Sequence, residues 1–170
     1  MAVHGALWSE YTKLLLQTAS ALAFYAFLRC GEFTIHGTHF SAANNLCMSD
    51  IIFHKDKRLF ILHLRASKTD VFRQGVDIQI YSMHCDVLVC PYRVMKKFYR
   101  IRILAGARPC DPLFLMDNGH ALSRTFFITT IKASLQSHCS RVTVLLSLRL
   151  DHCQVFIHSR NFALNPNLCQ

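Results

Sequence analysis

The apolar positions between residues 10 and 29 follow a helical pattern that changes along the segment. Its first half places apolar residues on one face, whereas from Ala19 onward it is apolar on all sides. We therefore predict a helix over residues 10–29 with a deeply buried second half, stopped by Gly31. The polar stretch 36–45 that follows predicts a loop.

Three short runs rich in β-branched, aromatic and leucine residues come next: Ile51–Phe53, Leu59–Leu64 and Val76–Tyr81. The charged turn 55–58 separates the first two, and the polar segment 65–75 joins the second to the third. This order predicts a small antiparallel sheet with a long basic hairpin loop.

Pro91 opens a further helix that we expect to reach about Ala105. One face of this helix is apolar and the opposite face is basic at spacings i, i+3, i+4 and i+7. The apolar stripe is Val94, Phe98, Ile101 and Ala105, and the basic face is Arg93, Lys96, Lys97 and Arg100.

The last predicted elements are an extended piece over 113–116, a turn at 117–119, and a helix to about Gln136 that Ser123 caps. The fold class we expect is α+β, mainly helical with a small antiparallel sheet. Beyond Gln136 the segment 137–170 has no capping pattern and no clear period.

Composition narrows the class of protein. In 170 residues, 52% are apolar and 17% are charged, which predicts one folded domain rather than a disordered chain. The net charge of +9 indicates a polyanionic partner, either nucleic acid or an anionic membrane surface. The longest apolar run, 14–28, contains polar residues and is shorter than the roughly 20 residues of a membrane span, so we expect a buried core helix there. Of the two polyanions, nucleic acid is the expected partner, and no membrane partner is expected.

The 8 cysteines form no C-x-x-C pair, and residues 1–10 carry no secretory signal pattern. We expect free thiols and a protein of the nucleus, if the source is eukaryotic, or otherwise of the cytoplasm. A zinc site at His36, His39 and Cys47 is an alternative, although its spacing is irregular. The leading expectation is no metal and no cofactor.

Three features carry candidate chemistry, each with two interpretations. Arg29 either holds an anion or caps the preceding helix while pairing with Glu32. Lys68, on the hairpin, either donates a proton to a leaving alkoxide or is solvated. The basic face that starts at Arg93 either follows a phosphate backbone or is simply the solvated side of a helix.

The order of these segments resembles the catalytic domain of the tyrosine recombinases, the phage-integrase family, in the form found in animal mobile elements and retroelements. The resemblance covers roughly residues 6–136 and is most specific around Arg29 and Lys68. The similar segments are ALAFYAFLRCGEF at 21–33, LCMSDI at 46–51, RASKTD at 65–70, FRQG at 72–75, CPY at 90–92, PLF at 112–114, DNG at 117–119 and LSR at 122–124.

The resemblance implies a partial recombinase fold and a partner of double-stranded DNA, with a homo-oligomer on that DNA as a further expectation. In such enzymes a tyrosine attacks the scissile phosphate, arginines hold its oxygens, and a lysine and a histidine move protons. Arg29 would clamp the phosphate, Glu32 would orient the site and Lys68 would be the general acid, without metal or small-molecule substrate. The expected DNA contacts are Arg65, Arg73, Gln74, Arg93, Lys96, Lys97 and Arg100.

The chain departs from the family pattern after Gln136. Its five tyrosines all precede the place of the nucleophile, and the Gly-His-Ser-x-Arg motif is absent. His138 and Arg141 come closest, at His-x-x-Arg spacing but without the neighbouring glycine and serine. The run RVTV at 141–144 can be read out of phase as Gly-His-Ser, so we hypothesise a frameshift or misplaced exon boundary, which the nucleotide sequence tests.

Three functions follow from these observations. The first is a recombinase-related DNA-binding fragment without catalytic activity. The second is an active DNA breaking and rejoining enzyme that uses an unusual tyrosine or one supplied in trans. The third is a basic protein-interaction module with no DNA role.

Overall fold

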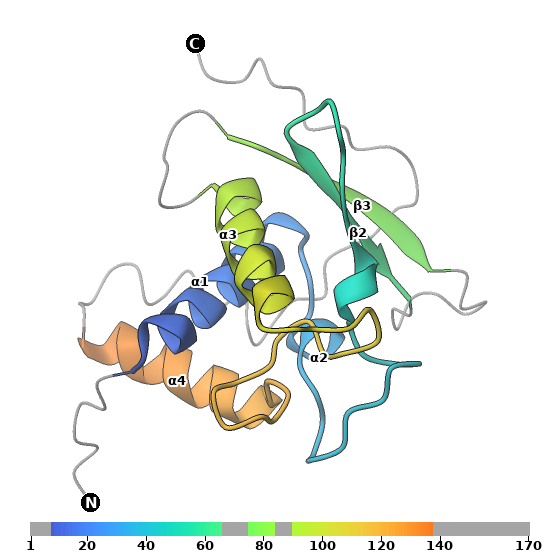
Figure 1. Ribbon diagram of the computed structural model, residues 1–170. Helices are drawn as coiled ribbons and strands as arrows, with labels where there is room; N and C mark the ends of the chain where they lie inside the picture. The colour runs from blue at the N-terminus through green and yellow to red at the C-terminus, as the bar shows by residue number, and fades with distance from the viewer. Residues whose placement is uncertain (1–7, 66–74, 84–89, 138–170) are drawn as a thin grey trace, which may run out of the picture.

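The computed structural model describes residues 8–65, 75–83 and 90–137, which form four α-helices and a small sheet (Figure 1). The expected α+β class is confirmed, because the helices pack beside one three-stranded antiparallel sheet. The core joins apolar side chains of α1, the sheet, α3 and α4 in a single cluster. Within the described ranges, no helix has the length and apolar character that crossing a membrane requires.

Helix α1, Glu10–Tyr25, begins where the Ser9 hydroxyl accepts a 3.0 Å hydrogen bond from the Thr12 backbone N–H. It ends at Tyr25, four residues before Arg29, where the sequence pattern predicted its end. Phe27 adopts a left-handed conformation (φ 53°), and the Leu28 N–H donates to the Ala23 carbonyl at 2.9 Å. This geometry closes the helix as a Schellman motif with phenylalanine in the usual glycine position.

The second half of α1 is less buried than predicted. Ala19 and Leu22 lie in the core, but the Phe24 side chain is 48% exposed. Among the described elements α3 has the most extensive contact with α1, and Phe24 lies outside the buried side of the helix.

The short helix α2, Cys30–Phe33, corrects the predicted role of Gly31. Gly31 lies inside α2 and does not stop α1. A Cβ atom at this position would approach the His36 imidazole Nε2 to 2.9 Å, so the small residue leaves room for that ring.

The sheet has the order β1-β2-β3, and its strands have the predicted bounds: Ile51–Phe53, Leu59–Leu64 and Val76–Tyr81. Both pairings are antiparallel, and Leu59 lies opposite Tyr81 while Leu64 lies opposite Val76. The one-turn 3-10 helix η1, Met48–Asp50, leads into β1.

Helix α3, Pro91–Leu104, begins at the predicted proline and packs against α1. Val94 and Phe98 are buried, Ile101 is half-buried, and Ala105, which was expected in the apolar stripe, is an exposed C-cap. Arg102 is buried on this face and was not foreseen. Its Nη2 donates to the Pro112 carbonyl at 3.0 Å, which ties α3 to the following loop.

Helix α4, Arg124–Ser137, begins after Ser123, whose hydroxyl accepts from the Phe126 N–H at 3.2 Å, as predicted. A parallel bridge joins Ile35 to Ser123 and so links the exit of α2 to the start of α4. The Phe127 ring meets Phe33 edge-on at 5.0 Å. These contacts fix α2 against α4.

Candidate nucleic-acid interface

Arg29 and Glu32 form one unit at the start of α2. The Glu32 carboxylate accepts a 2.7 Å hydrogen bond from the Arg29 backbone N–H, and its other oxygen lies 3.9 Å from the Arg29 Nη1. Glu32 is largely buried and Arg29 is about a quarter exposed. The backbone hydrogen bond thus holds the Glu32 carboxylate close to the Arg29 guanidinium. This arrangement suits an anion clamp and equally suits a helix cap.

The expected convergence of Arg29 with Lys68 stays a prediction. Lys68, Arg73 and Gln74 lie outside the described residues, as do His138 and Arg141.

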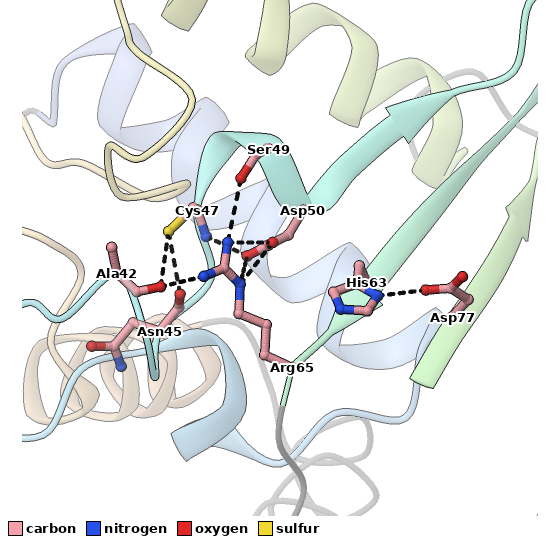
Figure 2. A network of polar contacts seen from close by, with 8 residues as sticks. All are labelled: Ala42, Asn45, Cys47, Ser49, Asp50, His63, Arg65 and Asp77. Carbon is pink, nitrogen blue, oxygen red and sulfur yellow. Dashed lines mark hydrogen bonds and ion pairs between the residues drawn. The ribbon is translucent and has the colours of Figure 1, made fainter. Parts of the chain in front are cut away.

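Arg65 has an internal role that the sequence did not indicate (Figure 2). Its Nε donates to the two Asp50 carboxylate oxygens at 2.9 and 3.1 Å, and its Nη2 donates to Oδ1 at 2.8 Å. Its Nη1 also donates to the Ala42 carbonyl. The hydrogen bonds that Arg65 donates to Asp50 raise the pKa of Arg65, so the side chain remains a cation. Its expected contact with DNA remains a prediction.

Asp50 is the centre of this network. It is 3% exposed, and it accepts a 2.8 Å hydrogen bond from the Cys47 backbone N–H as well as those of Arg65. The end of β2 is thereby fixed to η1 and to the loop before it (Figure 2). Because Arg65 directly follows β2, the network anchors the base of the predicted hairpin, whose residues 66–74 lie outside the described part of the chain.

His63 and Asp77 brace the same end of the hairpin from the two strands. They are partners in the β2–β3 register, and the imidazole Nδ1 lies 2.6 Å from the Asp77 Oδ1 (Figure 2). Sequence reasoning did not single out this pair, although the predicted strand pairing would have placed the two residues opposite each other.

The basic face of α3 has the predicted orientation. Arg93, Lys96, Lys97 and Arg100 are all exposed, opposite the face that packs on α1. Within residues 8–65, 75–83 and 90–137, none of these four side chains forms a salt bridge, in contrast to Lys13, which pairs with Glu10 at 2.7 Å. Four cations without acidic partners leave a positive face on one rigid helix.

The alternative zinc site is not assembled. In the part of the chain that the structure describes, no group of three or more His, Cys, Asp or Glu residues is arranged to hold a metal ion, and this includes His36, His39 and Cys47. Cys47 is buried, and its thiol lies 3.5 and 3.6 Å from the carbonyl oxygens of Asn45 and Ala42. Burial raises the pKa of that thiol. Cys30, Cys90 and Cys110 are also free, and Cys110 alone of these four is exposed.

Comparison of the chain with protein-family models, with curated proteins and with solved structures gives no match.

Proposed function

We propose that residues 6–136 are part of a DNA-binding domain of the tyrosine recombinase type, which holds duplex DNA through phosphate contacts and does not cleave it alone. The observation that carries the proposal is the basic face of α3, with four exposed cations that lack acidic partners in the described chain. Exposed cations that form no salt bridge attract phosphates and release counterions when they bind them.

The unit of Arg29 and Glu32 supports the recombinase type of this domain. A guanidinium oriented by a buried carboxylate can hold two oxygens of one phosphate in bidentate fashion. The anchored base of the hairpin supports the same assignment, because it would aim Lys68 from a fixed point. In this proposal Lys68 joins Arg29 at the phosphate.

The absence of cleavage rests on the tyrosines. No tyrosine follows Tyr99 in this sequence, and the hydroxyl of Tyr11 donates to the Leu115 carbonyl at 2.6 Å. Burial raises the pKa of both Tyr11 and Tyr99, which makes neither a ready nucleophile. A suicide DNA substrate incubated with the chain should give no covalent adduct. An adduct would favour instead the alternative of an active enzyme.

DNA binding itself is tested by fluorescence anisotropy with a labelled duplex. Lys97→Gln is expected to weaken binding severalfold, because it removes one phosphate contact. The matched control is Lys132→Gln, which removes an exposed lysine on α4 and should leave the affinity within about twofold. Equal effects of the two variants, or no binding by the wild type, would favour a protein-interaction module.

A further inference from the structure

A pocket of about 290 Å³ lies between the β1–β2 turn, the segment after β3 and the first turns of α3. Five residues from these three elements line it: Arg58, Ser82, Tyr92, Arg93 and Lys96. Two of them, Arg58 and Ser82, have no role in the DNA interface described above.

The sheet register builds this pocket. Leu59 pairs with Tyr81, so Arg58 and Ser82 flank the last rung of the β2–β3 ladder, and the Ser82 N–H donates to the Arg58 carbonyl at 2.7 Å. The Ser82 hydroxyl lies 3.5 Å from the Sγ of Cys90, the residue that precedes α3. These contacts hold the three walls together, so the pocket has a defined shape without a ligand.

The charge of the pocket is one-sided. Of the five described residues that line it, three are cations and none is acidic. Across the described ranges, Arg58 and Arg93 form no salt bridge, while the Lys96 ammonium rests 5.5 Å from the centre of the Tyr92 ring. Gathered cations repel one another, and a bound anion removes that repulsion.

We propose that this pocket binds a phosphate monoester. Two guanidinium groups and an ammonium match the two negative charges of a terminal phosphate better than the single charge of a phosphodiester. The Ser82 hydroxyl adds a neutral hydrogen-bond donor. The volume is at the lower end of the range for small-molecule sites, which allows a phosphate with a small organic group.

The pocket is separate from the base of the predicted hairpin at Arg65. Arg58 precedes β2 and Arg65 follows it, and a strand rises about 3.3 Å per residue, so the two lie about 20 Å apart. The pocket and the hairpin base are therefore at opposite ends of the sheet. The inference does not rest on the DNA-binding proposal, although Arg93 and Lys96 belong to both surfaces.

Isothermal titration calorimetry with inorganic phosphate and with adenosine monophosphate tests the proposal, at constant ionic strength set with sodium chloride. The full chain should bind both probes saturably. Arg58→Gln should weaken binding about tenfold and Ser82→Ala severalfold, since each removes a hydrogen bond to a charged ligand. The double variant Lys97→Gln with Arg100→Gln, outside the pocket, should change it less than about twofold.

The same variants separate the two proposals. The double variant Lys97→Gln with Arg100→Gln should lose DNA affinity and keep phosphate affinity. Arg58→Gln should lose phosphate affinity and keep DNA affinity. No saturable binding by the wild type, or equal weakening by the pocket variants and the α3 double variant, overturns the phosphate site without bearing on DNA binding.

The source of the monoester is tested by competition for adenosine monophosphate on the double variant Lys97→Gln with Arg100→Gln, whose weakened affinity for the duplex body keeps DNA from occupying the shared Arg93 and Lys96. Competition by a 5′-phosphorylated duplex but not by its 5′-hydroxyl counterpart supports a phosphorylated strand end. Competition by neither duplex supports a free phosphorylated small molecule. Equal competition by both duplexes shows that phosphodiesters suffice and contradicts the monoester proposal.

Discussion

The Arg65 guanidinium donates hydrogen bonds of 2.8 to 3.1 Å from Nε and Nη2 to the Asp50 carboxylate. The two residues are fifteen positions apart in the sequence. This contact fastens the end of β2 to the loop before β1. Arg65 thus holds the end of β2 in place, and its expected contact with DNA remains a prediction.

Removing the acid of this pair should destabilise the domain. In Asp50→Asn the buried position loses its charge and leaves Arg65 without its main partner, which should lower the free energy of unfolding by about 2 kcal/mol or more. Urea denaturation followed by circular dichroism measures the change. Asp56→Asn, in the exposed turn, is the control and should change stability by less than about 0.5 kcal/mol. A loss no larger than the control's would show that the network has little energetic weight.

The left-handed conformation of Phe27 predicts an unusual response to substitution. Glycine adopts this conformation without strain, so Phe27→Gly should leave stability unchanged or raise it by up to about 1 kcal/mol. Phe27→Val, with a branched Cβ, should lower stability by about 1 kcal/mol or more. Thermal unfolding of both variants checks this, and a glycine variant less stable than the valine variant would contradict the helix ending described for α1.

Stability should depend on pH through Asp111. A hydrogen bond from the Arg108 backbone N–H, at 2.9 Å, lowers the pKa of Asp111 below its ordinary value of 3.8. The unfolded chain therefore takes up this proton first as the pH falls. The Asp111 carboxylate therefore stabilises the fold at pH values above the ordinary pKa of the unfolded chain. This stabilisation is lost as the pH falls through the lowered pKa of the folded chain.

Asp111→Asn should accordingly reduce the unfolding free energy at pH 6, and the difference from wild type should shrink as the pH is lowered below 4. Urea denaturation at pH 6 and at several pH values below 4 measures it. A difference that stays constant over the range would mean that the carboxylate contributes nothing through its charge.

Local sequence patterns predict much of the fold. The predictions that failed depend on contacts between distant segments or on an unusual backbone conformation. Two of the strands are predicted by their β-like runs, Leu59–Leu64 and Val76–Tyr81. The start of α3 is predicted by its first residue, Pro91. The predicted end of α1 was wrong because Phe27 adopts the left-handed conformation that a sequence pattern assigns to glycine.

The candidate sites show the same division. The exposed cations of α3 follow from helical spacing alone, but the partner of Arg65 lies on a different element and no local pattern reveals it. The pocket residues Arg58 and Ser82 were missed, although the predicted antiparallel pairing, extended by one residue, would have placed them side by side.

The account depends above all on the basic face of α3 binding the phosphates of duplex DNA. The most direct test is the slope of the logarithm of the association constant against the logarithm of salt concentration, measured for the wild type and for Lys97→Gln with Arg100→Gln. We predict a steep negative slope for the wild type, reduced in magnitude by about 2 in the double variant, since each phosphate contact contributes about 0.9. Identical slopes for the two proteins would contradict the claim.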